Sequence, residues 1–153
     1  MNAQIKIADL VKNLEATSLR AYPKLNLFKG SNVEFNPSIC EATSYGWWKF
    51  VSRIGGLVVF NDYRYSVSTS KHQWKVRSLL NQLGIEIDLF IEAPQGLQNL
   101  DDAVRYYEVK IKCLNEDILK PRSQAAKNLE RKGEIKALQV KIKAIKKLIG
   151  KRK

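Results

Sequence analysis

Aromatic and basic side chains are mixed in an unusual way along residues 47–54. If this stretch is a β-strand, alternate side chains point to opposite faces, and one face then carries Trp47, Lys49 and Arg53. Arg64, in the third stretch of β-forming residues, Tyr63–Ser68, is expected to join that polar face. Aromatic rings stack on nucleobases while Lys and Arg neutralise phosphates, so the mixture predicts a nucleic acid-binding surface. The alternative is a half-exposed sheet with ordinary solvating bases.

A helix is expected directly after this sheet, because Ser70 and Gln73 have the spacing of a capping box and Gly84 can end the helix in a left-handed conformation. Trp74 would lie nearly opposite the apolar face of this helix, in the sector of Lys71 and Lys75. Its partner would be a nucleobase, another protein surface or the basic tail. Alternatively, Trp74 packs under the loop 23–46.

The expected start of the same helix also predicts a phosphate seat. Free backbone N–H groups and the helix dipole favour an anion there, and Thr69, Ser70 and Lys71 would make the contacts. Ordinary capping explains these residues as well. The candidate nucleic acid-binding residues are therefore those of the phosphate seat, of the sheet face and of the outer helix face. Arg77 is added to them.

Four acidic residues, Asp62, Glu86, Asp88 and Glu92, raise the question of a metal-dependent nuclease. Such a core needs carboxylates on adjacent strands, and the stretch 63–68 has none. Glu86 and Asp88 fit the solvent face of a half-buried strand, although the sequence leaves open whether they hold a metal ion. With a single histidine and no Gly-rich phosphate loop, we expect neither cofactor nor catalysis, and a nuclease is only the third hypothesis.

The positive charge of the chain is concentrated at its C-terminus. The chain has a formal net charge of +12, and residues 120–153 hold thirteen of its 27 Lys and Arg but only two acids, Glu130 and Glu134. The other 119 residues are almost neutral. A cationic appendage on a neutral body favours a polyanionic partner.

This tail is expected to be helical, with an interruption near Gly133. Its aliphatic residues have helical spacing and form a seam that could pair with a partner helix or a second copy: Ile135, Leu138, Ile142, Ile145 and Ile149. Five lysines fall on an adjacent flank, and they complete the predicted nucleic acid-binding set: Lys132, Lys136, Lys143, Lys146 and Lys147.

Hydrophobic periodicity predicts the elements that carry these residues. An amphipathic helix ends before Pro23, residues 23–46 form a loop with at most a short extended piece, and a fourth strand spans residues 85–92. A long helix, capped by Asn99, runs to Pro121. Between the loop and the helix at Ser70 lies a three-stranded antiparallel meander of Trp47–Ile54, Leu57–Phe60 and Tyr63–Ser68, joined by two-residue turns.

The sequence therefore predicts an α+β protein with an N-terminal helix, a meander plus a fourth strand packed with helices, a long helix and a basic helical tail. Its domains would be a body of residues 1–119 and the tail of residues 120–153. Two distant cysteines without a metal or disulfide spacing favour a reducing, cytoplasmic setting, and no apolar run is long enough to span a membrane. The leading hypothesis is a small non-catalytic nucleic acid-binding protein, with DNA weakly favoured over RNA. The alternative is a protein-interaction module that uses the tail seam.

Overall fold

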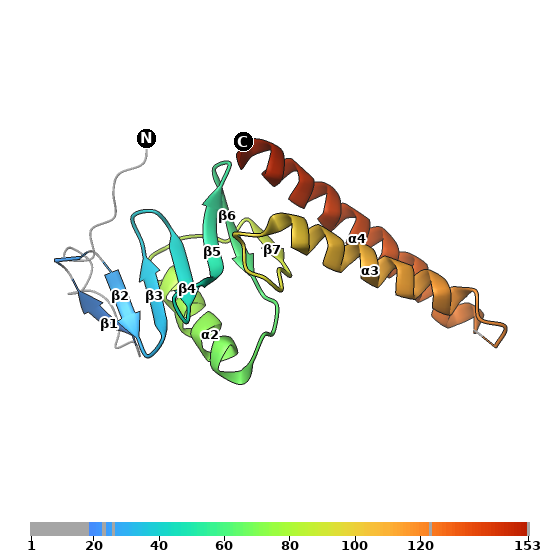
Figure 1. Ribbon diagram of the computed structural model, residues 1–153, viewed down its shortest axis with the longest axis horizontal. Coiled ribbons are helices and arrows are strands. Elements are labelled where there is room, and N and C mark those ends of the chain that lie inside the picture. Colours follow the sequence, from blue (N-terminus) through green and yellow to red (C-terminus); the bar gives the residue numbers. More distant parts are fainter. Residues whose placement is uncertain (1–18, 23, 26, 123, 153) are drawn as a thin grey trace. The chain divides into compact units, whose positions relative to one another are not determined.

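The computed structural model describes residues 19–22, 24–25, 27–122 and 124–152 (Figure 1). The chain divides into two compact units, Met1–Gln98 and Asn99–Lys153. The boundary between the two units thus lies about twenty residues before residue 120, where the basic tail of the sequence begins. The helix predicted before Pro23 lies outside the described residues as far as residue 18, and Arg20–Tyr22 is a strand, β1.

The first unit is built on a sheet with seven strands among the described residues, in which the strands follow one another in chain order. Neighbours are antiparallel from β1 to β6, whereas β6 and β7 are parallel. The strands after β1 are β2 (Leu27–Gly30), β3 (Val33–Asn36), β4 (Glu41–Ser44), β5 (Trp48–Ile54), β6 (Leu57–Asn61) and β7 (Leu89–Ile91).

The prediction that residues 23–46 form a loop was wrong, because β2, β3 and β4 lie there. Phe28, Phe35 and Ala42 are buried, and the register pairs Phe28 with Phe35 and Phe35 with Ala42. Each strand has only four residues, so its alternation is too short to stand out from the turn residues around it. The sheet is therefore wider than the four strands expected.

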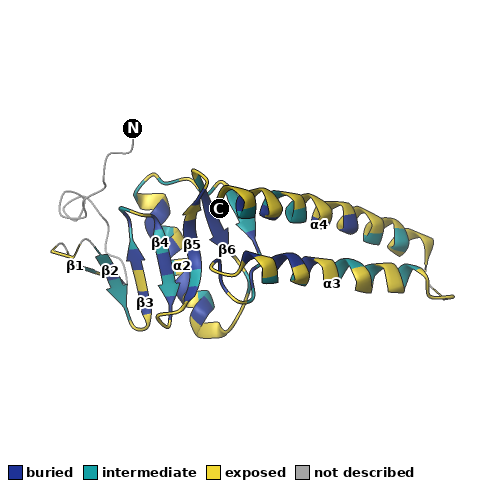
Figure 2. Cartoon of the chain, turned by 45° about the horizontal axis from the view of Figure 1, so that its top comes forward, coloured by how far each residue is buried: buried dark blue, intermediate teal, exposed yellow. Residues whose placement is uncertain are grey.

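Helix α2 (Val67–Gln82) connects β6 to β7 and packs on one face of the sheet. Parallel neighbours need a crossover of this kind. Val76, Leu79 and Leu80 of α2 are buried in one cluster with Trp48 and Phe60 of the sheet, which accounts for the dark blue centre of the strands in Figure 2. Gly84 ends the helix at φ +72° as expected.

A buried amide network replaces the predicted third strand of the meander, Tyr63–Ser68. The Asn61 Oδ1 atom accepts from the N–H of Ala93 at 2.9 Å and of Tyr63 at 3.1 Å, and its Nδ2 donates to the Ala93 carbonyl at 2.8 Å. Gln73 Nε2 donates to the carbonyls of Asn61 at 2.6 Å and Tyr63 at 3.1 Å. Because side chains satisfy these backbone groups, the chain leaves the sheet after Asn61.

The predicted fourth strand is much shorter than expected. Only Leu89–Ile91 pairs with the sheet, although Ile85 and Ile87 still pack against the core. Asp88 forms two hydrogen bonds with Val58 of β6. Its N–H donates to the Val58 carbonyl at 2.8 Å, and its carboxylate accepts from the Val58 N–H at 2.7 Å. These bonds hold residues 85–88 near β6 without extending the strand pairing.

The second unit contains two helices side by side, α3 (Leu100–Ile118) and α4 (Ala125–Arg152). Asn99 caps α3 as predicted, since its Oδ1 accepts from the Asp102 N–H at 3.1 Å. The expected interruption near Gly133 was wrong, because α4 is continuous there. Its seam packs within the chain: Ile135, Leu138 and Ile145 are buried, and Ile142 shares a groove with Ile111 of α3.

His72 is buried on the sheet-facing side of α2. Its Nδ1 lies 2.7 Å from the Ser44 hydroxyl, and its ring packs against Tyr45. Burial lowers the pKa of His72 below its usual 6.5; Lys75 adds to the shift, and a hydrogen bond to the Ser31 backbone opposes it. Folding therefore favours the neutral form of His72.

The free energy of unfolding should decrease as the pH falls below about 6.5, because the unfolded chain then takes up a proton at His72 that the folded chain does not. Urea denaturation at pH 7.5 and 5.5 measures this. In His72→Gln the decrease should be smaller than in the parent protein. An equal decrease in both proteins would assign the pH dependence to other groups.

Gly133→Ala should stabilise the protein by about 0.5–1 kcal/mol, since the residue lies inside an exposed helix where alanine is preferred and an added Cβ meets nothing within 4 Å. Gly84→Ala is the matched control. It also has open space, but its φ of +72° should make the same substitution cost about 1 kcal/mol. Thermal unfolding of both variants checks the two signs, and a destabilised Gly133→Ala would argue against a continuous α4.

Candidate nucleic acid interface

The N-terminus of α2 differs from the prediction that placed the cap at Ser70. The helix begins at Val67, and its cap is Ser66, whose hydroxyl accepts from the Thr69 N–H at 3.1 Å. Thr69 is buried, and the Ser70 N–H already donates to the Ser66 carbonyl at 3.0 Å. The phosphate seat predicted at Thr69, Ser70 and Lys71 therefore rested on a wrong helix start, and of the three only Lys71 is exposed.

The outer face of α2 carries Trp74 and several polar residues. The Trp74 side chain is 71% exposed, so it does not pack under residues 23–46. Lys71 and Arg77, three residues before and after it, are also exposed, and Lys75 is half-buried. Residues three and four apart are neighbours on a helix surface. The structure thus brings an aromatic ring and three positive charges together on one helix.

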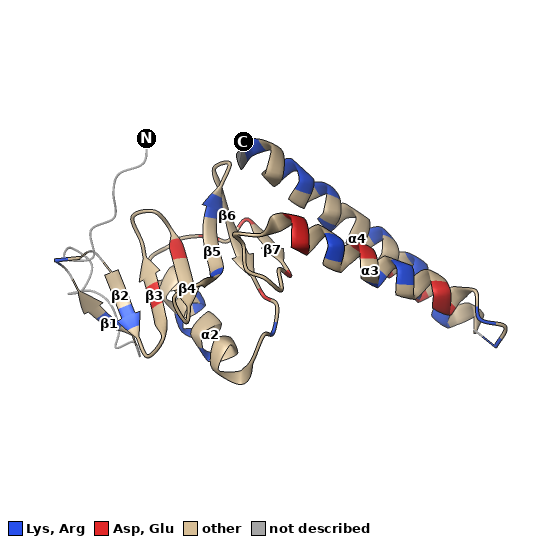
Figure 3. Cartoon of the chain, in the orientation of Figure 1, with Lys and Arg blue, Asp and Glu red and all other residues tan. Residues whose placement is uncertain are grey.

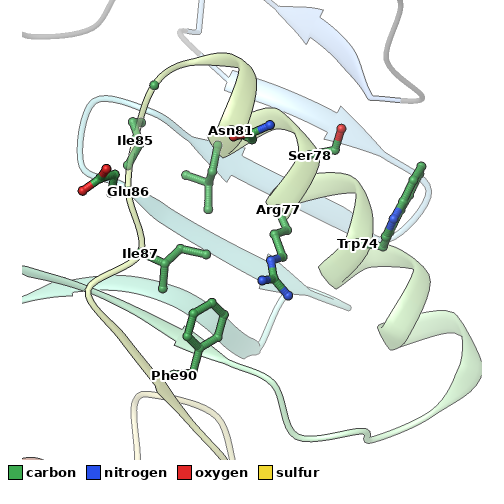
Figure 4. A pocket seen from close by; sticks show the side chains of 10 residues that line it. Trp74, Arg77, Ser78, Asn81, Ile85, Glu86, Ile87 and Phe90 are labelled. Atoms are coloured by element: carbon green, nitrogen blue, oxygen red, sulfur yellow. The ribbon is translucent and has the colours of Figure 1, made fainter.

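An open hollow lies between α2 and residues 84–90, and it has a volume of about 800 Å³. Its apolar part comes from Leu80, Ile85, Ile87 and Phe90. Its polar part comes from Arg77, Ser78, Asn81 and Glu86, and Trp74 adds an aromatic ring. Figure 4 shows the Arg77 side chain extending from α2 towards Phe90, where its guanidinium carbon lies 4.8 Å from the ring centroid. We call this site the α2 hollow.

A bulge in β5 separates Lys49 from Arg53, which the sequence placed on one face. Lys49 pairs with Thr43 while Val51 pairs with the adjacent Ala42, so β5 contains one extra residue. The extra residue reverses the alternation, and the two basic side chains point to opposite faces. Both Phe50 and Val51 can therefore be buried.

Both basic residues of β5 also have partners inside the protein. Lys49 Nζ forms an ion pair with Glu41 at 3.1 Å. Arg53 lies beside Cys40: burial raises the pKa of this thiol, and the hydrogen-bonded Arg53 guanidinium opposes that shift. Neither side chain joins the outer face of α2.

Trp47 and Arg64 both lie outside the strands that were predicted to hold them. Trp47 lies in the turn before β5 and is 46% exposed, and its ring packs edge-on against Tyr65 at 6.0 Å. Arg64 is exposed in the irregular segment 62–66. The predicted single basic and aromatic sheet face is thus replaced by an aromatic pair at Trp47 and Tyr65 and by the separate surface of α2.

The five predicted lysines of α4 are all exposed: Lys132, Lys136, Lys143, Lys146 and Lys147. Figure 3 shows the blue positions distributed along α4, whereas the red acidic positions of this unit lie mainly on α3. Lys120 differs from them because it pairs with Asp117 at 2.8 Å, which lowers the pKa of Asp117 and raises that of Lys120. We call the five exposed lysines the lysine flank.

The acidic residues considered for a nuclease are not gathered into one group among the described residues. Asp88 is bonded to Val58, and Glu86 lies at the edge of the α2 hollow. In the part of the chain that the structure describes, no three His, Cys, Asp or Glu side chains are grouped so that they could hold a metal ion. No helix among the same residues is long and apolar enough to cross a membrane.

Comparisons with known proteins add no further assignment. No protein-family model, curated protein or solved structure significantly matches this chain. The residues and their arrangement therefore carry the whole functional argument.

Sequence reasoning missed residues 85–90 as part of the α2 hollow, chiefly Ile87 and Phe90. One signal for Phe90 was present: it is the only aromatic residue among the polar positions 86, 88, 90 and 92 of the predicted strand. A large ring at a solvent-facing position indicates a contact outside the strand. Here that contact is Arg77.

Ser66→Ala should cost about 0.5–2 kcal/mol of stability, as expected for the loss of a side-chain N-cap. Ser70→Ala removes the same hydroxyl from the second turn and should change stability by less than about 0.5 kcal/mol. Urea denaturation of the two variants compares them directly. A larger loss of stability in Ser70→Ala would instead identify Ser70 as the N-cap, as the sequence predicted.

Proposed function

We propose that this protein binds nucleic acid without catalysing a reaction on it. The observation that supports this most is the lysine flank, because it lies on a helix whose apolar side is already used inside the chain. From Ile135 to Arg152, α4 has seven Lys and Arg and no acid. A solvated helix face usually mixes both signs of charge.

The lysine flank suits a polyanion for an electrostatic reason. Lysines spaced three or four residues apart on one helix repel one another, and a chain of phosphates that replaces their counterions would relieve this repulsion. Counterion release from the nucleic acid would then supply affinity that does not depend on base sequence. The position of the lysines along one helix favours a linear polymer of charges.

The outer face of α2 makes nucleic acid a better ligand than an acidic protein or a lipid surface. Trp74 offers an exposed ring, while Lys71, Lys75 and Arg77 lie within one turn of it. Stacking platforms for bases combine rings and cations in this way. The tail contains no Trp, Tyr or Phe, which are the residues that anchor amphipathic helices in lipid. DNA remains the first ligand to test, with RNA as the second.

A protein-interaction module is the second candidate, and a particular observation favours it. Four apolar residues of the two-helix unit are largely exposed, namely Val109, Leu119, Leu129 and Val140. These residues, rather than the seam that faces α3, would meet a partner helix or a second copy. In this case the lysines would contact an acidic protein surface.

Removal of three flank charges should weaken nucleic acid binding and its salt dependence. For the triple variant Lys136→Gln, Lys143→Gln, Lys147→Gln, we expect the slope of log K against log salt on duplex DNA to become shallower by about 2 to 3, at about 0.9 per lost phosphate contact. Fluorescence anisotropy at several salt concentrations measures the slope.

The matched control removes three positive charges elsewhere, as Lys29→Gln, Lys112→Gln, Lys120→Gln. If it changes the slope as much as the flank variant, only net charge matters and the flank is not an interface. If the parent protein binds neither DNA nor RNA at low salt, the proposed function is wrong.

A further inference from the structure

The α2 hollow has the composition of a site for a flat, partly apolar ring. Leu80, Ile87 and Phe90 give it an apolar lining that is buried or half-buried, while the half-buried Ser78 and the exposed Asn81 and Glu86 contribute polar groups. Small-molecule sites commonly combine an apolar surface with a few polar groups that orient the ligand. The volume of about 800 Å³ is within the range of such sites.

Trp74 is the first of two planar groups that line this hollow. It is 71% exposed, so most of its indole surface contacts water. A ring that stacks on it would remove apolar area from water and gain the contacts of aromatic pairs. The nearest cations on the helix surface, Lys71 and Arg77, lie three residues on either side.

Arg77 is the second planar group, and Phe90 holds it in place. The guanidinium carbon is 4.8 Å from the centroid of the Phe90 ring, the distance of a cation–π contact. This contact uses one side of the guanidinium and leaves its N–H groups for a ligand. An arginine ordered in this way can stack on a base or bind a phosphate with less entropy loss than a free side chain.

The polar groups match the edge of a nucleobase. Asn81 provides an amide that both donates and accepts, Ser78 provides a hydroxyl, and the exposed Glu86 carboxylate can accept from an exocyclic amino group or a sugar hydroxyl. The cations near Trp74 can neutralise the attached phosphate. A purely aliphatic ligand would leave these polar groups without partners.

We infer that the α2 hollow binds one unpaired nucleobase of a single-stranded nucleic acid, with Trp74 and Arg77 as its stacking groups. This inference rests on the proposed function and adds the class of substrate to it. A base inside a duplex is already stacked and paired, and its extrusion costs a few kcal/mol. The hollow should therefore make the protein prefer single strands, whereas the lysine flank binds phosphates of either form.

Two oligonucleotides of equal length and charge test this inference. One is a single strand of thymidines, and the other has the same sugar-phosphate backbone with every base removed. With the full chain at fixed salt, the base-containing strand should bind about 5- to 150-fold more tightly, the ratio expected for one stacked base. Equal affinities would overturn the inference while leaving backbone binding, and hence the proposed function, intact.

Variants then locate the base site. Trp74→Ala should abolish most of the difference between the two oligonucleotides, whereas Trp74→Phe should retain part of it. Arg77→Lys keeps the charge but loses the planar group, so it should reduce the difference without changing the salt slope. Lys146→Gln should weaken binding of both oligonucleotides equally.

Two outcomes of these measurements have different meanings. If Trp74→Ala binds less tightly but keeps the full base preference, the bases are bound elsewhere and the inference is wrong. If neither oligonucleotide binds at low salt, the proposed function is wrong, and the inference that rests on it is wrong as well. Circular dichroism of each variant verifies the fold, and Trp74 is exposed enough that its replacement should leave the core unchanged.

Discussion

The first unit depends on one buried network of amide groups, in which Asn61 is the centre. Its side chain pairs with both backbone polar groups of Ala93, and its own carbonyl accepts from Gln73 of α2. Asn61, Gln73 and Ala93 are buried, and one buried polar group left without a partner would cost about 1–3 kcal/mol. The network thus fixes together the end of β6, the segment after β7 and the first half of α2.

The parallel pairing of β6 and β7, which α2 connects, also forms the α2 hollow. The chain that leaves α2 at Gly84 must run back alongside the helix until it pairs with β6 at Leu89. Phe90 consequently lies opposite Arg77, at 4.8 Å, although the two residues belong to different elements. The hollow is a product of the crossover, and neither α2 nor β7 alone would make it.

Local signals predicted a large part of this fold. Strong runs of β-forming residues located β5 and β6, Gly84 marked the end of α2, and Asn99 with its two following acids located α3. The strands of residues 27–44 were missed because four residues contain only two inward positions, such as Val33 and Phe35. Their pairing with neighbours, rather than their own pattern, makes them strands.

The missed parts of the candidate site have long-range causes. Tyr63–Ser68 has the composition of a strand, but Gln73 and Asn61 satisfy the Tyr63 backbone from outside, and no local pattern reports such bonds. Likewise, one extra residue in β5 turns Lys49 and Arg53 to opposite faces. A periodicity argument assumes regular alternation, so a bulge invalidates every face assignment that follows it. Trp74, whose exposure depends only on the helix period, was placed correctly.

The two proposed binding surfaces, one in each unit, would respond differently to salt, and this divides their roles. Affinity from the lysine flank comes from counterion release and falls steeply as salt rises. Stacking on Trp74 involves the uncharged face of a base, so its contribution depends much less on ionic strength. At low salt the flank would dominate and hide any preference for unpaired bases, whereas at higher salt the remaining affinity would come increasingly from the hollow. Selectivity would therefore belong to the α2 hollow of the first unit, whereas the lysine flank of α4 would mainly increase the rate of encounter with the nucleic acid.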